Sequence, residues 1–599
     1  MTSRIGLATI CVTILCHTLL LYQSAALYSP TWDEPGHLVA GLSHWEFGRF
    51  NLYPVNPPLV RFVAAAPAYW RGKLAVDWTA YNPDPVHRSE VFVGRRFFQQ
   101  HGQAAMGTLT MARRFGILFS ILGAVFIARW AIEVGGINAG VAATFLWCFS
   151  PTILGHGALI TPDVGAASTF IVAAFYVTRW IRRPSWAAAC GMSLAIALAI
   201  SAKTTNWVIL PTAAILWVLH GVLEQAAQSE ASRQRQLLQL SAACAVAVLL
   251  FNALYGFQGT GTRLRSYAFV SSTLGDTVEG RGNRFHDTQL GMLPIPLPSD
   301  FVYGVDIQKR DIERGLRVPG WRSYLRGTWQ QGGWYHFYLS AMLLKESFGT
   351  IILFVVAVFA AALTGRLLSH WMIWLPAIAI VALVSSQSAF TMHYRYVLPA
   401  LPFVYLLSGV FVARTSGLAK LMSWGLVACS VIGSLSVYPN SLSHFNLTAA
   451  HAGQGEKSLV DSNVDWGQDL LFLKKWLNAH PEAKPLKLAY FGSFDPRDFQ
   501  ISYQIPRPLP DNTRSRPMEA QRQLGPQPGW HAVSVNYKQG CLMPVPNGEG
   551  DYRYFGEPVF SYFEEFSPIA RIGGSIEIFD LTEEEVNSVR RKLDLPLIE

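Results

Sequence analysis

Long, uninterrupted apolar stretches recur along most of this chain. The first, residues 5–27, contains no charged residue, and about 20 apolar residues are enough to cross the hydrocarbon core of a bilayer. A cleaved signal peptide would have a shorter apolar core followed by soluble chain, so we expect this helix to be retained. Similar stretches lie at residues 115–133, 138–152, 164–180, 186–202, 206–223, 238–256, 347–364, 371–387, 396–413 and 418–438. The pattern predicts a polytopic α-helical membrane protein with about eleven transmembrane helices.

Three longer polar pieces lie between or after these stretches. Two are loops, at about residues 28–113 and 257–346, and the third is a tail. We expect residues 1–440 to form a transmembrane domain and residues 441–599 a small soluble domain. The tail has one helix-like stretch and three β-like runs, which predict a mixed α/β fold. These lie at residues 466–480, 486–491, 530–537 and 575–579.

The composition supports a membrane protein. Hydrophobic residues make up 51% of the chain. Charged residues make up 15%, where a soluble chain carries roughly 25%. Disorder, collagen, a small disulfide scaffold and an ordinary cytosolic enzyme are thereby excluded. The net charge of +9 does not indicate nucleic-acid binding, because the chain has no dense basic run. Only Cys541 lies outside the apolar stretches, so we expect no disulfide in the soluble parts.

The positions of Lys and Arg predict the orientation, because short cytoplasmic loops are enriched in these residues. With the N-terminus in the cytoplasm, the short outer loops hold only Lys203 and Arg395, and both large loops and the tail lie outside. We therefore expect a multi-pass protein of the inner (cytoplasmic) membrane with an extracytoplasmic C-terminal domain. The residues that then face the cytoplasm are Arg4, Arg129, Arg179, Arg182, Arg183, Arg233, Arg235, Arg366, Arg414 and Lys420.

Two adjacent carboxylates follow the first apolar stretch. We expect Asp33 and Glu34 to lie at the outer membrane surface, where a charged side chain is costly unless water solvates it or it has a functional role. Asp33 could alternatively cap a helix whose first residue is Pro35. Residues 37–50 then predict an interfacial amphipathic helix, and Pro57-Pro58 breaks the chain before a second surface helix.

Further motifs lie at the outer ends of the apolar stretches. They are Asn56-Pro57-Pro58-Leu59, Ser150-Pro151 with Thr161-Pro162-Asp163, Ala202-Lys203-Thr204, Trp334-Tyr335-His336-Phe337-Tyr338 before Leu344-Lys345-Glu346, and His393-Tyr394-Arg395-Tyr396-Val397-Leu398-Pro399. In this order, together with Asp33-Glu34, they resemble the membrane-embedded glycosyltransferases of the GT-C fold that use polyprenyl-phosphate sugars. This group, glycosyltransferase family 39, includes the protein O-mannosyltransferases and the bacterial aminoarabinose transferases.

The resemblance covers about residues 1–440 and implies a GT-C-like fold. In the tail, residues 461–470 resemble a block found in a bacterial branch with an outer C-terminal domain. Asn56 departs from the family pattern, since relatives often carry His or Lys at this position.

Sugar transfer from a lipid phosphate requires a carboxylate base for the acceptor hydroxyl and cations for the leaving phosphate. We expect Asp33 to be the base, with Glu34 or Asp163 orienting the acceptor or holding the base. Arg395 ranks first among the phosphate-binding cations because it offers a bidentate fork. Lys203 and Lys345 could alternatively extend to lipid headgroups, and Asp163 could cap its helix. The full set of expected phosphate-binding residues is Arg395, Lys345, Lys203 and Arg61, and the other expected pocket residues are His393, Asn56 and Tyr396.

The leading hypothesis is an inverting, mannosyltransferase-like glycosyltransferase. It would move a monosaccharide from a polyprenyl-phosphate donor to a hydroxyl of a protein, lipid or glycan at the outer membrane face. A transporter or flippase for a lipid-linked or polar substrate is the alternative, although transporters place charges near the midplane and carry internal repeats. A membrane-tethered sensor or scaffold is a third possibility.

The expected partners are the donor, the acceptor and the bilayer. No nucleotide-binding motif is present, so a nucleotide-sugar donor is disfavoured. No tight spacing of metal ligands is present, so no cofactor is expected, with a divalent metal left open.

Overall fold

The computed structural model describes residues 3–72, 74–223, 230–276, 280–317, 322–365, 370–387, 392–447, 449 and 454–598, and the structural statements below refer to these residues. Arg366, one of the residues expected to face the cytoplasm, lies outside them.

All eleven predicted apolar stretches form helices. Within the described residues, seven helices are long and apolar enough to cross a membrane, which makes this a multi-pass membrane protein. They are α1 (Ser3–Leu27), α5 (Gln103–Gly135), α8 (Pro162–Arg182), the 3-10 turn Thr204–Val208 with α10 (Ile209–Leu223), α11 (Glu230–Leu254), the 3-10 turn Tyr394–Ala400 with α17 (Leu401–Arg414), and α18 (Gly417–Val437). Three shorter apolar helices are α9 (Trp186–Ala202), α15 (Phe348–Leu363) and α16 (Trp371–Ser386).

The stretch predicted as one span at residues 138–152 is broken. It forms α6 (Ile137–Cys148) and α7 (Pro151–Gly157), which meet at an angle of 58°. Pro151 cannot donate the amide hydrogen bond that would continue α6, and it is well suited to the first position of a new helix. The Ser150 side chain caps that new helix by accepting a hydrogen bond from the Ile153 amide.

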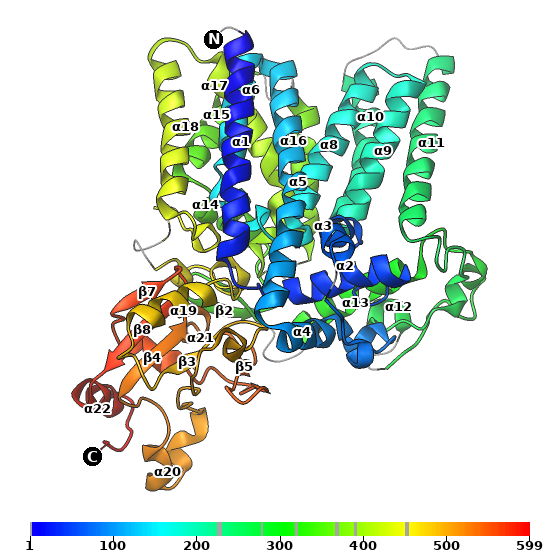
Figure 1. The fold of residues 1–599 in the computed structure, drawn as a ribbon. Helices are drawn as coiled ribbons and strands as arrows, with labels where there is room; N and C mark the ends of the chain where they lie inside the picture. Colours follow the sequence, from blue (N-terminus) through cyan, green and yellow to red (C-terminus); the bar gives the residue numbers. More distant parts are fainter. Residues whose placement is uncertain are drawn as a thin grey trace.

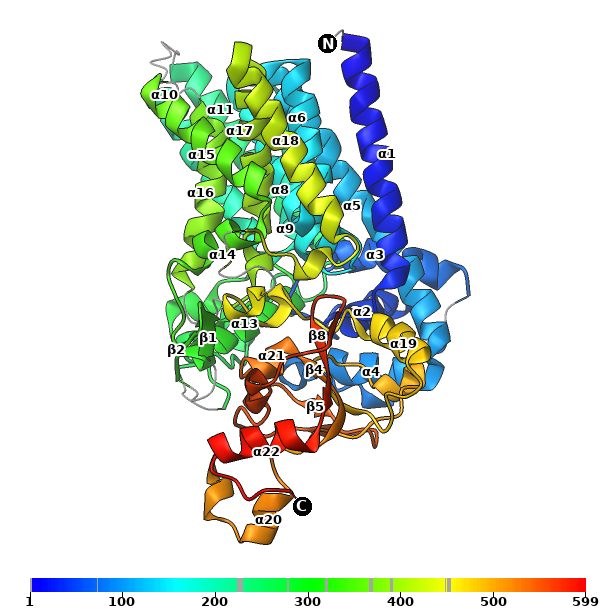
Figure 2. The same ribbon diagram turned by 90° about the vertical axis from the view of Figure 1, so that its left-hand side faces the viewer.

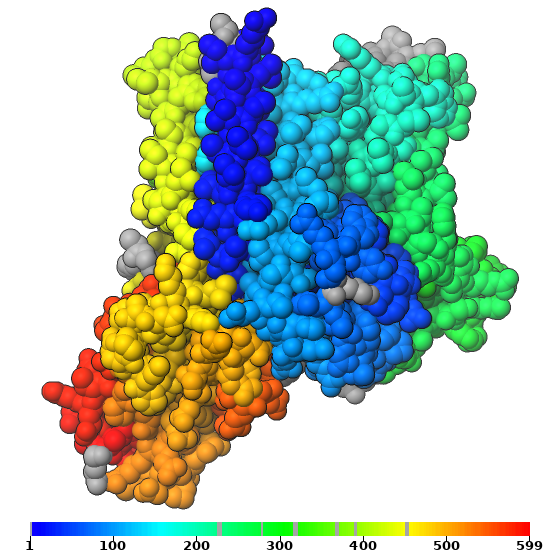
Figure 3. All heavy atoms as spheres, viewed as in Figure 1, coloured from blue at the N-terminus to red at the C-terminus, as the bar shows by residue number. Residues whose placement is uncertain are grey.

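The spans stand side by side, with the N-terminus at one end of the bundle and the two large loops and the tail at the other (Figures 1 and 2). Helix α8 is central in the bundle. In its most apolar 18-residue segment 89% is buried inside the protein, whereas the corresponding share for α1 is 28%. Figure 3 shows α1 as a stripe along the outside of the bundle. Its exposed Ile5, Val12 and Leu15 suit contact with lipid.

The first loop packs three helices beneath the spans, namely α2 (Glu34–Phe47), α3 (Leu59–Trp70) and α4 (Ser89–His101). Helix α3 follows Pro58, as predicted from Pro57-Pro58. Helix α2 differs from the half-exposed surface helix predicted there, because every residue from Glu34 to His44 is buried. Its neighbours α3 and α4 pack against it and cover the face that the sequence pattern assigns to water.

The second loop contributes α12 (Ser272–Gly275), α13 (Ser299–Arg317), the antiparallel strands β1 (Arg322–Leu325) and β2 (Thr328–Gln331), and α14 (Phe337–Lys345). Helix α14 leads through Glu346 and Ser347 into α15, so it brings Lys345 to the outer end of that span.

The tail forms a mixed four-stranded sheet in the order β3-β4-β8-β7. Strands β3 (Lys487–Ala489) and β4 (Gly529–Ser534) are parallel, and β8 (Ile576–Leu581) pairs antiparallel with both β4 and β7 (Ala570–Ile572). Helices α19 (Leu470–Ala479), α20 (Met518–Arg522), α21 (Val535–Lys538) and α22 (Glu583–Lys592) and the short pair β5 (Val545–Pro546) and β6 (Tyr552–Arg553) complete it. The three β-like runs overlap β3, β4 and β8, except that residues 535–537 at the end of the second run belong to α21. The mixed α/β prediction is confirmed.

The tail is joined to the start of the first loop by backbone hydrogen bonds. The Ser29 amide donates to the Gln468 carbonyl at 3.0 Å, and the Trp32 amide donates to the Trp466 carbonyl at 2.9 Å. Segments more than 400 residues apart in sequence are therefore held together where the membrane part meets the tail.

The orientation remains a prediction that reporter fusions can check. Alkaline phosphatase fused after residue 445 is expected to be active, and the same enzyme fused after residue 230 to be inactive, because the loop charges place these positions on opposite sides. An inactive fusion at residue 445, with expression confirmed on a blot, would reject this orientation.

The joint between tail and membrane part contains two buried carboxyl groups, Asp465 and Asp469. Asp465 accepts hydrogen bonds from the Gly467 amide and the Ser534 hydroxyl, and Asp469 accepts one from the Ser575 hydroxyl. Burial raises the pKa of Asp465 to about 7 and, with the neighbouring Asp465 charge, raises the pKa of Asp469 to about 8.

The free energy of unfolding should therefore fall as the pH rises from about 4 to about 8, because the folded chain holds these protons more tightly than the unfolded chain. Thermal unfolding in detergent should show a lower Tm at pH 8 than at pH 5.5. Replacing both residues, Asp465→Asn with Asp469→Asn, should flatten this dependence, whereas Asp580→Asn, an exposed change on β8, should preserve it. An unchanged pH dependence in the double variant would contradict the assignment.

Candidate functional site

Asp33 lies at the start of α2, but its side chain does not cap that helix. Its carboxylate instead accepts a hydrogen bond from the Arg395 guanidinium, with Nη1 and Oδ2 2.9 Å apart. The Asp33 side chain is 23% exposed, so it remains open to a ligand from outside. The capping alternative for Asp33 is thus replaced by an ion pair with a residue of the 3-10 turn that precedes α17.

Asp163 lies in the first turn of α8, after Pro162. Its Oδ1 is 2.6 Å from the Lys203 ammonium, and its Oδ2 is 3.8 Å from Nη1 of Arg395. Together with Asp33 these residues form a row of alternating sign, Asp33–Arg395–Asp163–Lys203, which we call the outer charge cluster. Since Lys203 is buried and turned toward Asp163, it does not extend to lipid headgroups.

Local structure explains why these four side chains meet. Asp33 immediately precedes α2, Asp163 begins α8, Lys203 immediately follows α9, and Arg395 lies in the 3-10 turn before α17. Each is at a helix end on the side of the large loops and the tail (Figure 1). A carboxylate is favourable in the first turn of a helix, where the helix dipole is positive. The cluster therefore lies at one end of the bundle, outside the middle of the spans.

Aromatic rings flank the cations of the cluster. The Arg395 guanidinium lies 4.1 Å from the centre of the Trp466 ring, and the Lys203 ammonium lies 4.7 Å from the centre of the Tyr396 ring. Two buried polar atoms of the cluster, Nε of Arg395 and Oδ2 of Asp163, have no hydrogen-bond partner among the described residues. A buried donor without a partner is costly, which suits a site completed by a ligand.

Glu34, the other expected acid, faces a different partner. Its carboxylate receives two hydrogen bonds from Arg113 of α5, at 2.8 and 2.5 Å, and further ones from Thr31 and from the Ile160 amide. Arg113 also donates to backbone carbonyls at the end of α1. This closed network fixes the turn that carries Asp33, so Glu34 holds Asp33 in place.

Breaking this pair is expected to destabilise the fold strongly. Glu34→Gln should lower the free energy of unfolding by about 3–5 kcal/mol, because both side chains are fully buried and Arg113 would keep an uncompensated charge. Glu133→Gln, which removes a half-exposed partner of Arg129, is a matched control that should cost less than about 1 kcal/mol. Denaturation in detergent measures both, and equal losses would contradict this account.

Arg61 and Asn56 form a neighbouring group. The Arg61 guanidinium donates to Nε2 of His44 and to the carbonyls of Tyr53 and Asn56. Asn56 thus contributes its backbone carbonyl to this contact. Burial, followed by the Arg61 charge, holds the pKa values of His44 and His37 well below their ordinary value. Both rings are neutral at pH 7, and His37 lies within electrostatic reach of Arg61, Asp163 and Arg395.

Lys345 and His393 contact the tail. The Lys345 ammonium is buried and donates to the carbonyls of Leu442 and Asn463, at 2.9 and 2.6 Å, so it does not extend to headgroups either. His393 is hydrogen-bonded to the Ser462 hydroxyl and lies 3.2 Å from an oxygen of Asp461. The structure therefore brings Asp33, Asp163, Lys203, Arg395 and Tyr396 together and places the other predicted residues around them.

Two contributors, Trp466 and Arg113, were absent from the predicted site. Trp466 lies in residues 461–470, the tail block with the bacterial resemblance, and that resemblance is the only signal in the sequence for a position next to Arg395. Arg113 gave no signal, since an arginine beside an apolar stretch is read most simply as a loop residue.

Among the described residues no group of three or more His, Cys, Asp and Glu side chains is arranged to hold a metal ion.

Comparison of the sequence with known protein families and with curated proteins gives no match. Solved structures that are similar to this chain include the following three. ArnT from Cupriavidus metallidurans in the apo state has a TM-score of 0.42 and 14% identity, over 72% of this chain and 64% of that chain, which is less than two thirds of its length.

ArnT from the same organism bound to undecaprenyl phosphate has a TM-score of 0.40 and 11% identity, over 95% of this chain and 97% of that chain. The Archaeoglobus fulgidus oligosaccharyltransferase in the apo form has a TM-score of 0.42 and 11% identity, over 76% of this chain and 59% of that chain. These likenesses concern the course of the chain and assign no role to any residue.

Proposed function

We propose that this protein is an inverting glycosyltransferase. It moves a monosaccharide from a polyprenyl-phosphate donor to a hydroxyl of a protein, lipid or glycan at the outer face of the inner (cytoplasmic) membrane. The observation that carries the proposal is the outer charge cluster, which places a carboxylate that is 23% exposed beside a guanidinium side chain that is 11% exposed, at the level of the helix ends.

Asp33 is the base in this proposal. A single displacement needs a carboxylate that takes the proton from the acceptor hydroxyl while the hydroxyl oxygen attacks the sugar from the face opposite the phosphate. The Arg395 guanidinium donates a hydrogen bond to that carboxylate. Binding of the donor phosphate gives Arg395 a stronger acceptor, and Asp33 is then released toward the acceptor hydroxyl.

Arg395 and Lys203 bind and stabilise the leaving phosphate. The unpartnered Nε of Arg395 supplies a further donor, so the guanidinium can offer two parallel hydrogen bonds to phosphate oxygens. Asp163 holds both cations in position through its two carboxylate oxygens. Arg61 and Lys345 add positive charge on either side of this centre, and Tyr396 lies against both phosphate-binding cations.

Release of polyprenyl phosphate tests this function. The protein in nanodiscs is incubated with a donor carrying a radiolabelled sugar and with a hydroxyl acceptor fraction from the cell envelope. The expected result is transfer of the label with stoichiometric release of polyprenyl phosphate. A protein that moves intact donor between the leaflets of proteoliposomes without releasing polyprenyl phosphate would be a flippase instead.

A further inference from the structure

A polar pocket in the tail domain lies apart from the outer charge cluster and plays no part in the proposed transfer step. Its volume is about 400 Å³, within the range of pockets that hold small ligands. Six charged side chains line it: Glu456, Lys457, Lys538, Glu564, Arg571 and Glu577. They come from the chain that follows the last span, from α21, from β7 and β8, and from the turn before β7.

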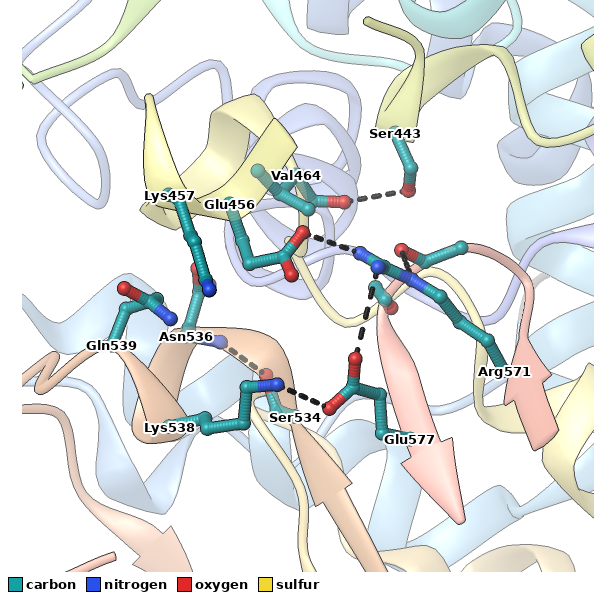
Figure 4. Close-up of polar contacts among 12 residues, drawn as sticks. Ser443, Glu456, Lys457, Val464, Ser534, Asn536, Lys538, Gln539, Arg571 and Glu577 are labelled. Carbon is teal, nitrogen blue, oxygen red and sulfur yellow. Dashed lines mark hydrogen bonds and ion pairs between the residues drawn. The ribbon is translucent and has the colours of Figure 1, made fainter. Parts of the chain in front are cut away.

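These side chains form a connected set of ion pairs. The Lys538 ammonium lies 2.7 Å from one oxygen of Glu577, and Arg571 lies 3.7 Å from the other. Arg571 also donates to Glu456 at 2.8 Å. Figure 4 shows Glu456, Lys538, Arg571 and Glu577 turned toward one another from different elements. Lys538 is only 9% exposed and Glu577 only 5%, so the inner wall of the pocket is fixed.

The pocket has an unused polar atom. Glu456 is 1% exposed, and one of its oxygens accepts from Arg571, while the other, Oε1, has no hydrogen-bond partner among the described residues. A buried carboxylate oxygen without a donor is costly, and a ligand hydroxyl would supply the missing hydrogen bond.

The charges select the kind of ligand. Three bases and three carboxylates line the pocket, so its formal charge is zero. Because the positive and negative charges balance, the pocket offers a free anion or a free cation no net electrostatic attraction. A hydroxyl both donates to carboxylate oxygens and accepts from ammonium and guanidinium groups, so adjacent hydroxyls can pair with side chains of alternating sign. We propose that this pocket binds a neutral, hydroxyl-rich ligand, the sugar residues of a glycan acceptor.

The segment of residues 456–466 links this pocket to the outer charge cluster. Glu456 lies at its start, Asp461 and Ser462 contact His393, and Trp466 lies over the Arg395 guanidinium. An acceptor held at the pocket is thus bound by the same stretch of chain that contacts the transfer site. The assignment of the ligand as acceptor rests on the proposed function, whereas binding of a neutral saccharide does not.

Binding of defined saccharides to the full chain in nanodiscs tests the inference. The probes are the methyl α-pyranosides of glucose, mannose and galactose, together with maltose, followed by saturation-transfer NMR. At least one probe is expected to bind, and Glu456→Gln and Lys538→Met should each weaken binding about tenfold or more through loss of a charged hydrogen-bond partner. Lys457→Ala removes a side chain that is 44% exposed, so it should weaken binding without affecting folding.

Glu584→Gln on the exposed face of α22 is the matched control and should bind as the wild type does. Thermal unfolding monitors folding of every variant. Absence of binding by all four saccharides, unchanged binding in folded Glu456→Gln and Lys457→Ala, or displacement of the saccharide by inorganic phosphate or L-lysine would each overturn the inference.

The experiment also separates this inference from the proposed function. Asp33→Asn should bind saccharide like the wild type. Saccharide binding without any release of polyprenyl phosphate would overturn the glycosyltransferase and leave the pocket standing. Release of polyprenyl phosphate by a chain that binds no saccharide would overturn the pocket alone.

Discussion

Turnover should fall at least about 100-fold when Asp33 is replaced by Asn, with little change in folding. The factor is the scale of general-base catalysis, because an amide cannot take the proton from the acceptor hydroxyl. Asn keeps the size of the side chain and can still accept a hydrogen bond from Arg395. Release of polyprenyl phosphate at saturating donor and acceptor measures the effect.

Asp287→Asn is the matched control for this change. Asp287 is an outer-loop carboxylate that is 96% exposed, so its amide variant should retain wild-type turnover. Tm in detergent reports folding for both variants. If folded Asp33→Asn turns over like the wild type, Asp33 only neutralises Arg395, and the base has to be sought elsewhere.

Arg395 variants should lose donor affinity and turnover while acceptor affinity changes little, because negative charge develops on the departing phosphate. Arg395→Ala should lower kcat/KM for the donor by about 100-fold or more, since charge-assisted hydrogen bonds are lost. Arg395→Lys keeps the charge but loses the fork, so a loss of about tenfold is expected. Donor titration in nanodiscs gives both constants.

Arg414→Lys provides the comparison, because Arg414 lies in the last turn of the same helix, at the opposite end. Its guanidinium contacts Nε2 of His370 at 2.7 Å and takes no part in the outer charge cluster, so this variant should keep wild-type donor affinity and turnover. Lys345→Ala should weaken donor binding if its ammonium shares the phosphate site. Near-wild-type donor affinity and turnover in folded Arg395→Ala would remove Arg395 from the site and weaken the glycosyltransferase proposal as a whole.

The spans could be predicted because a bilayer demands long apolar segments whatever their partners are. Prediction failed where tertiary contacts decide the outcome. Helix α5 begins at Gln103, well before the apolar stretch at residue 115, and it buries Arg113 against Glu34, which compensates its charge. That partner is 79 residues away in sequence, so no local pattern reports it.

The same limit applies to the site. Asp33, Asp163, Lys203 and Arg395 could be recognised as charges at outer helix ends, but the sequence does not say which acid pairs with which base. Asp33 and Arg395 are 362 residues apart. Their pairing follows from how α2, α8 and α17 pack, and packing of that kind depends on the whole chain.

The contacts of Lys345 have a consequence for the order in which this protein is assembled. Synthesis proceeds from the N-terminus, so Lys345 is made before Leu442 and Asn463, whose carbonyls accept its hydrogen bonds. Trp466, whose ring lies over the Arg395 guanidinium, is made later still. The nascent membrane part therefore carries an incomplete charge cluster until the tail has been made and has docked. Docking of the tail is thereby the step that completes the surroundings of Lys345 and Arg395.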